Sequence, residues 1–334
     1  MNLLRLRFEA PFDRLLYLVE DNEEQVCVQQ IHNLKNLKNQ NLAIHGYVYN
    51  DDPLMLGLCH GLLCLMSVYT HPCEPKRLRF LIHTFNLITG EYQQLPHFDG
   101  WDDYYQTNIG FGYDVSSQKF KVVMVRFYTN RSVKIESDTV RIKNQVFVHT
   151  LGSFAWRRIV DAPSILNNQR EQISSVFVNG SLHWITSSDD HKLFIVTFNL
   201  GVEEFKVIST PESLGCSSDC LLDKQYKLGV LEGCLSLVDC THLAFFDMWV
   251  FQNNNEKKPW VNKFSIRKIS LWQFCNRICP IRYQKNGEIL LLCDDQFLVS
   301  YDTKTNTHTT RAIKKLGKKN LGNVNVFPAL GSFI

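Results

Sequence analysis

VFVNGSLHWITSSDDHKLFIVTFNLGVEEFKVISTP, residues 176–211, is the most regular stretch of this 334-residue sequence. Its β-branched and aromatic residues form four runs typical of short strands, and polar residues separate the runs. Asn179 and Gly180 suit a tight turn between the first two runs, because glycine accepts a positive φ and asparagine tolerates it. The stretch therefore predicts a four-stranded antiparallel meander, with strands near residues 176–178, 182–185, 193–198 and 204–208.

A unit of this kind recurs along the chain, and most copies begin about 50 residues after the previous one. One longer interval contains a charged insertion at residues 130–143. Four strands per unit at this period are typical of a kelch-like β-propeller, so we predict an all-β propeller of about six four-stranded blades. A two-sheet β-sandwich is the alternative. Corresponding points of the repeat are marked by Gly61, Gly112, Gly180, Gly233 and Gly287.

The division of the chain follows from the repeat. Residues 57–334 contain the five regular units, whereas residues 1–56 are less regular. We expect residues 1–56 to complete the propeller, paired with the C-terminal strands. Each blade would bury its apolar faces only against its neighbours.

Composition and charge limit the classes of partner. The formal net charge is +3, which by itself predicts neither nucleic-acid binding nor membrane binding. A basic segment at residues 311–319 is expected to be a solvated end, with a localisation signal as the alternative. The N-terminus is interrupted by charges and does not resemble a signal peptide, and no apolar run is long enough to span a membrane. We therefore expect a cytoplasmic protein with reduced thiols, the nucleus being the alternative location.

Candidates for chemistry are weak. Zinc ligands could be chosen from Cys59, His60, Cys64, His71 and Cys73, but their spacing fits no common zinc pattern. The Cys216/Cys220 and Cys275/Cys279 pairs have no neighbours that mark a lowered thiol pKa. We expect Asp189, Asp190 and His191 to form a solvated turn. The motifs of hydrolases, zinc proteases and nucleotide-binding enzymes do not occur. We therefore predict no catalytic, metal-binding or cofactor-binding residues, and keep a propeller enzyme (a metal oxidase or hydrolase) as the alternative.

Recognition of a partner is expected in irregular loops. Residues 98–107, FDGWDDYYQT, combine aromatic side chains, which commonly anchor protein interfaces, with acids that suit a basic partner. The alternative is that these rings pack between blades. Arg126 and Arg131 belong to a second candidate edge. We predict partner-binding roles for Trp101, Asp102, Asp103, Tyr104, Tyr105 and Arg131. In contrast, Trp156, Trp184 and Trp260 lie at or near strand positions and are expected in blade cores.

An ordered series of short motifs across about residues 57–305 resembles the F-box-associated domain of plant F-box proteins, especially the S-locus F-box-like branch. Each motif is weak alone, and their order makes the resemblance specific. The motifs are Gly57-Leu58-Cys59-His60-Gly61-Leu62-Leu63-Cys64-Leu65, Gly110-Phe111-Gly112-Tyr113-Asp114, Phe120-Lys121-Val122-Val123, Phe177-Val178-Asn179-Gly180-Ser181-Leu182-His183-Trp184, Met248-Trp249-Val250, Trp260-Val261-Asn262-Lys263-Phe264-Ser265-Ile266 and Leu298-Val299-Ser300-Tyr301-Asp302.

The resemblance implies a non-catalytic substrate-recognition module of an SCF-type ubiquitin ligase, which presents a target protein for ubiquitination. In the family an N-terminal F-box grips the Skp1 adaptor of the cullin complex. No F-box pattern occurs before Leu15, so we expect Skp1 binding only if an F-box is supplied. A decoy that binds the same target without an F-box is an alternative function. For the S-locus branch, which acts in self-incompatibility, the resemblance implies a ribonuclease as target.

Overall fold

The structure is a computed structural model. It describes residues 16–22, 25–30, 48–49, 54–71, 74–86, 89, 91–98, 105–128, 144–159, 162–163, 175–187, 192–212, 214, 226–252, 259–271, 275, 277–284, 286–294, 297–312 and 325–328. Within these ranges, no helix has the length and apolar character needed to cross a membrane.

The described residues form six β-sheets, which we number as blades in chain order. Blades 2 to 5 are meanders in which strands that are neighbours in sequence pair in antiparallel fashion. In blade 1 the short strand β3 pairs with β5 rather than with β4, and the sixth sheet joins the two ends of the chain. Blade 1 contains β3 (Val48–Tyr49), β4 (Leu54–Cys59), β5 (Leu62–His71), β6 (Glu74–Asn86) and β7 (Tyr92–Gln94). Blade 2 contains β8 (Tyr105–Asp114), β9 (Lys119–Tyr128), β10 (Asn144–Thr150) and β11 (Arg157–Arg158). Blade 3 contains β12 (Val176–Val178), β13 (Ser181–Ser187), β14 (Leu193–Asn199) and β15 (Glu204–Ser209).

Blades 4 and 5 follow the same pattern, and a three-stranded closing sheet joins the two ends of the chain. Blade 4 contains β16 (Tyr226–Leu231), β17 (Cys234–Asp239), β18 (Phe245–Phe251) and β19 (Trp260–Arg267), and the short helix α3 (Lys268–Leu271) follows it. Blade 5 contains β20 (Ile278–Tyr283), β21 (Ile289–Cys293), β22 (Phe297–Asp302) and β23 (Thr307–Ala312). The closing sheet contains β1 (Leu16–Asn22), β2 (Gln25–Gln30) and β24 (Asn325–Pro328).

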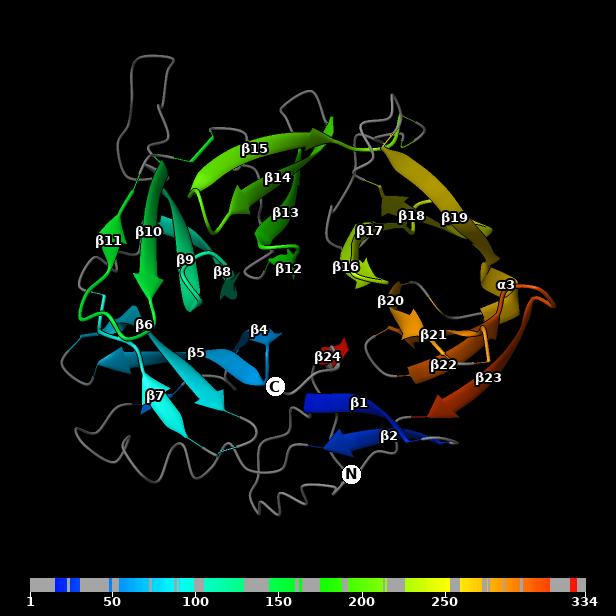
Figure 1. Ribbon diagram of the computed structural model, residues 1–334, viewed down its shortest axis with the longest axis horizontal. Helices are drawn as coiled ribbons and strands as arrows, with labels where there is room; N and C mark the ends of the chain where they lie inside the picture. The colour runs from blue at the N-terminus through cyan, green and yellow to red at the C-terminus, as the bar shows by residue number, and fades with distance from the viewer. Residues whose placement is uncertain are drawn as a thin grey trace.

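The six sheets are arranged around a common centre, with β4, β8, β12, β16 and β20 innermost in their blades (Figure 1). This radial arrangement of six sheets, four of which have four strands, confirms the predicted all-β propeller and argues against the two-sheet sandwich. The four strands predicted in residues 176–211 are β12 to β15, and each agrees within a few residues at its ends.

Glycines at positive φ mark the first hairpin turn of four blades. These are Gly61, Gly180, Gly233 and Gly287. Gly112, which was predicted to mark the same point of the repeat, lies instead inside β8. The corresponding turn of blade 2 follows at residues 115–118, where Gln118 has the positive φ. The assignment of Gly112 to the same point of the repeat was therefore wrong by several residues.

Gly112 has a different physical role, because it lets blade 3 approach β8. A Cβ atom added at Gly112 would lie 2.3 Å from Cδ2 of Phe177 and 2.9 Å from Cδ1 of Leu200. Gly110, on the same face of β8, is approached as closely by Leu182. Both glycines thus provide the space into which apolar side chains of blade 3 pack.

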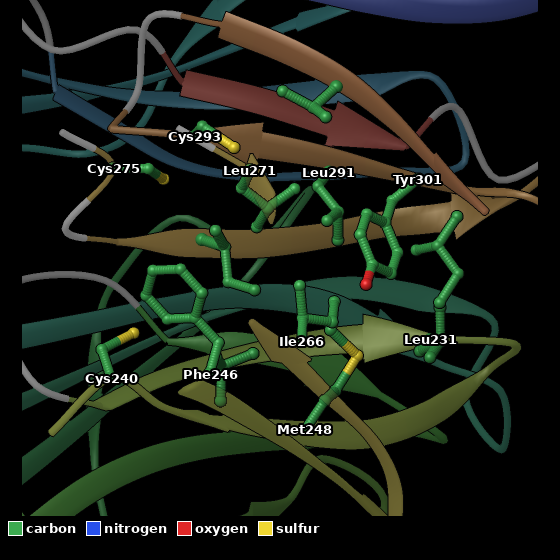
Figure 2. Packing of buried hydrophobic residues seen from close by; sticks show 14 of the residues in the cluster. Leu231, Cys240, Phe246, Met248, Ile266, Leu271, Cys275, Leu291, Cys293 and Tyr301 are labelled. Carbon is green, nitrogen blue, oxygen red and sulfur yellow. The ribbon is translucent and has the colours of Figure 1, made fainter. Parts of the chain in front are cut away.

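The four interfaces between successive blades, from blade 1 to blade 5, are continuous apolar layers. Between blades 2 and 3, valines of β9 and β10 pack with Leu182, Trp184 and Phe198. Between blades 4 and 5, Phe246, Met248 and Ile266 face Leu291 and Tyr301 (Figure 2). Blade interiors are therefore covered on both faces, as in β21, whose five residues are all buried.

Tryptophans lie at these interfaces. Trp184 and Trp260 are buried, which confirms their predicted place in blade cores, whereas Trp156 is half-buried. The indole N–H of Trp260 donates to the carbonyl of Ser209 at 2.7 Å, which links blade 4 to blade 3. The indole N–H of Trp156 donates in the same way to Pro96, in the connection that leaves blade 1, at 2.9 Å.

The closing sheet joins the two ends of the chain. β1 pairs in antiparallel fashion with β2 and in parallel fashion with β24, so that Leu16 lies opposite Asn325. Figure 1 shows this sheet between blades 1 and 5. The division of the chain at residue 56 into a completing segment and the regular blades stays a prediction.

Two buried histidines are held in the neutral form. His83 and His183 are 4% and 7% exposed. The Nδ1 atom of His83 lies 2.5 Å from the hydroxyl of Tyr92, and that of His183 lies 3.3 Å from the carbonyl oxygen of Val176. Burial lowers the pKa of each imidazole to about 4, because the charged form loses its hydration.

Replacement of Gly112 by alanine should destabilise the propeller by about 1–3 kcal/mol, because the new methyl group has no space beside Phe177. Urea unfolding followed by tryptophan fluorescence measures this change. The matched control is Gly57→Ala on β4, where a Cβ would lie at an ordinary contact distance of 3.4 Å from Phe111. If the two substitutions lower the free energy of unfolding equally, the close approach of blade 3 to β8 does not contribute to stability.

Stability should fall as the pH is lowered from 7 to 5. An unfolded histidine takes up a proton near pH 6.5, whereas His83 and His183 resist protonation until about pH 4. Each histidine should then contribute about 2 kcal/mol to the loss. Unfolding free energies at both pH values should show a smaller drop for His83→Gln and His183→Gln than for the unchanged chain. A drop of unchanged size in both variants would contradict this origin.

Candidate protein-binding surface

The strand order defines two ends of the ring. In blades 2 to 5 the first strand turns into the second, and the third into the fourth, at one end, which we call the short-turn end. In blade 1 the same turns join β4 to β5 and β6 to β7. At the opposite end lie the connections between second and third strands and between blades. The loop of residues 99–104 precedes β8, and the insertion at residues 129–143 follows β9. Because Tyr105 pairs with Tyr128, both segments join blade 2 at the end opposite the short turns.

The predicted partner-binding residues fall mostly outside the described residues. Trp101, Asp102, Asp103, Tyr104 and Arg131 belong to this group, and Tyr105 is described only as the first residue of β8. Their role stays a prediction. Arg126, placed by the sequence on the same exposed edge as Arg131, is instead buried, with its guanidinium 5.2 Å from the centre of the Phe98 ring.

The residues considered for metal binding do not form a described site. Cys59 and Cys64 are buried, whereas the exposed His60 ring packs beside Tyr113. Burial raises the pKa of Cys59 to about 12 and that of Cys64 further, so both are neutral thiols. Cys73 and the side chain of His71 lie outside the described residues. Across the described ranges, no three His, Cys, Asp or Glu side chains are grouped to hold a metal ion.

Of the other polar candidates, only the Cys275/Cys279 pair lies within the described residues. Cys275 is buried and Cys279 is half-buried, and the described cysteines are free thiols. Cys216, Cys220, Asp189, Asp190 and His191 lie outside the described residues.

The most elaborate polar arrangement that the structure describes lies at the short-turn end, between blades 2 and 3. Lys121 on β9 is buried, and its Nζ lies 3.0 Å from Asp114 Oδ2 and 3.0 Å from Glu203 Oε1. It also donates to the carbonyl of Leu200 at 2.7 Å. A nitrogen of Arg157 lies 2.7 Å from both carboxylate oxygens of Glu203. We call Asp114, Lys121, Arg157 and Glu203 the Lys121 network.

Local turn chemistry completes the surroundings of Asp114. Its Oδ1 accepts hydrogen bonds from the backbone N–H and hydroxyl of Ser116, and its Oδ2 accepts one from Ser117. Burial alone would raise the pKa of Asp114, but these hydrogen bonds and the one from Lys121 outweigh it and hold the pKa well below its usual range. The pKa of Glu203 is lowered in the same way, with Arg157 and Lys121 outweighing burial. Both carboxylates are therefore ionised at neutral pH.

The Lys121 network fixes three turns relative to one another. Asp114 begins the β8–β9 turn, Glu203 ends the β14–β15 turn, and Arg157 follows the β10–β11 turn. The first two turns touch, since a Cβ added at Gly201 would lie 3.4 Å from Asp114 Oδ1 and from the hydroxyl of Ser116. These turns thus form one rigid surface across two blades.

Large apolar side chains project from each of these three turns. Val115 is 73% exposed, Phe154 98% and Val202 66%. Among the described residues of the corresponding turns in blades 1, 4 and 5, His60-Gly61, Glu232-Gly233 and Thr303 to Asn306 are polar or small. Exposed apolar groups that gather on one rigid surface are typical of a site for another protein.

Sequence reasoning missed this surface, although two signals were present. Asp114 followed by Ser116 and Ser117 is typical of a side chain that caps its own turn. Lys121 stands between the apolar residues of a strand, where a cation is expected only with a partner.

A closed ring of antiparallel meanders with a rigid, partly apolar surface defines a β-propeller suited to binding another protein. The family whose model matches residues 14–329 is described as the F-box associated beta propeller domain. This chain belongs to that family, as the motifs in its sequence predicted.

Individual relatives agree with the family. An F-box protein of Arabidopsis thaliana is 24% identical over 332 residues, covering 90% of this chain and 73% of that protein. An F-box/kelch-repeat protein of the same plant is 28% identical over 240 residues, covering 71% of this chain and 59% of that protein. The matched part of the chain thus spans 73% of the length of the first relative and 59% of the second. Among solved structures, the β-propeller domain of the Trilobed protease from Pyrococcus furiosus has a TM-score of 0.40 at 11% identity, covering 80% of this chain and 86% of that one.

The loss of Lys121 should destabilise the chain strongly. In Lys121→Met, Asp114 would stay buried without its cation, which costs about 3–5 kcal/mol. The matched control is Lys119→Met, an exposed lysine two positions away, which should change the unfolding free energy by less than about 0.5 kcal/mol. Urea unfolding at pH 7 compares the two. Similar small effects would contradict a structural role for the network.

Proposed function

We propose that this chain is the target-binding propeller of an SCF-type ubiquitin ligase receptor and that it acts in the cytoplasm. The observation that carries the proposal is the family match over residues 14–329, together with relatives that are F-box proteins. An F-box joined to the propeller would bind the Skp1 adaptor, and the propeller would bring the target protein to the ligase.

The chain's own residues are proposed to act by binding rather than by catalysis. The buried histidines His83 and His183 are neutral and engaged in hydrogen bonds. The buried thiols of Cys59 and Cys64 are protonated, and the most elaborate ionic arrangement that the structure describes links two blades at a surface. A ribonuclease target and a role in self-incompatibility stay predictions for the S-locus branch.

The proposal is tested with a fusion protein that carries an F-box at the N-terminus of this chain. The F-box is taken from the Arabidopsis F-box protein that is 24% identical to the chain, and the fusion is expressed in plant cells. The fusion should co-purify with Skp1 and should lower the abundance of a small set of proteins at least twofold. Proteasome inhibition should restore these proteins, because their loss depends on ubiquitination.

Two controls separate the propeller's contribution. The F-box alone should bind Skp1 without lowering these proteins, and the chain alone should bind them and raise their abundance by competition. If no protein changes in a propeller-dependent way, the chain is not a ligase receptor. Stoichiometric copper or zinc in the purified chain, measured by elemental analysis, would favour a propeller enzyme instead.

A further inference from the structure

The short-turn end of the ring is divided by charge. Among its described residues, blades 2 and 3 expose Lys119, Arg157, Arg158 and Lys206 against the single exposed acid Glu204. Arg157 is offset by Glu203, which leaves an excess of positive charge. In the described turns of blades 1, 4 and 5, the exposed charged residues are Glu91, Glu232 and Lys304, so these turns have no excess of positive charge.

The positive half coincides with the exposed apolar side chains. Val115, Phe154 and Val202 project from the three turns that the Lys121 network fixes. Lys119 follows the first of these turns, Arg158 the second and Lys206 the third. Apolar side chains therefore lie among cations on one surface, which we call the blade 2–3 surface.

We propose that the blade 2–3 surface binds an acidic segment of the target protein that carries large apolar side chains. This inference rests on the proposed function and adds the chemistry of its target. Carboxylates of the segment would meet Lys119, Arg158 and Lys206, and its apolar side chains would cover Phe154 and the two valines.

Rigidity of the blade 2–3 surface favours binding. Exposed loops usually lose conformational freedom when a partner binds, and this loss lowers affinity. Here Lys121 and Arg157 hold the three turns in place before a partner arrives, at contact distances of 2.7–3.0 Å. The described turns of the other blades have no such excess of positive charge, so the charge pattern also selects the segment's position.

Fluorescence anisotropy with the purified chain tests the inference. The probe is a labelled synthetic peptide in which Phe and Leu alternate with Asp and Glu, and the control peptide has Lys in place of the acids. The acidic peptide should bind at least tenfold more tightly than the basic one, and added salt should weaken its binding.

Variants locate the site on the chain. Phe154→Ser should weaken binding at least fivefold, and the Lys119→Glu/Lys206→Glu double variant about tenfold. Leu243→Ser is the apolar control, because Leu243 is 95% exposed in the connection between β17 and β18 at the other end. Lys304→Glu is the charge control on blade 5. All these side chains are exposed, so thermal unfolding should be unchanged.

Several results would overturn the inference. Equal binding by Phe154→Ser and the unchanged chain would do so, as would an equal loss in Leu243→Ser. If the chain forms a dimer that Phe154→Ser dissociates, and the peptide does not bind, the occupant is a second copy of the chain.

The F-box fusion separates this inference from the proposed function. Target turnover that continues unchanged in the Phe154→Ser fusion would contradict the surface and leave the ligase role intact. If the unchanged fusion lowers no protein, the ligase role fails, and the peptide experiment still decides the chemistry of the surface.

Discussion

The structure depends on one constraint: each sheet has two apolar faces, and only a neighbouring sheet can cover them. No blade could therefore be stable alone, and the apolar layers between blades hold the ring together. The packing is closest at β8, where Gly110 and Gly112 provide space for Phe177 and Leu182 of the next blade. At β8, close packing of the two blades requires residues that have no Cβ atom.

Electrostatics add a second link between blades 2 and 3. A buried ion pair usually costs about as much in lost hydration as it gains in attraction, so it contributes little net stability. The Lys121 network instead defines how blades 2 and 3 are positioned relative to each other. Lys121 contacts Asp114 on its own blade and Glu203 and Leu200 on the next. The same ionic contacts that align two blades also position the exposed side chains above them.

The fold was largely predictable because its signals are local. The alternation in residues 176–211 and the Asn179-Gly180 turn define a meander with no knowledge of the rest of the chain. The position of Gly112 was misjudged because its reason, Phe177, lies on another blade. The site was less predictable for the same cause: Lys121 meets Leu200 and Glu203, which are 79 and 82 residues away in sequence. Arg126 looked solvated because nothing in its local sequence shows that Phe98 covers it.

The parallel pairing of β1 with β24 has a consequence for the order of events during synthesis. One edge of β1 can pair early with β2, but the other edge, at residues 16–19, has no partner until residues 325–328 have left the ribosome. The central blades consist of strands that are adjacent in sequence, and they can assemble while translation continues, whereas closure of the ring must wait for its end. During this interval β1 has an unpaired edge, which is the kind of surface that chaperones protect and that promotes aggregation when left exposed.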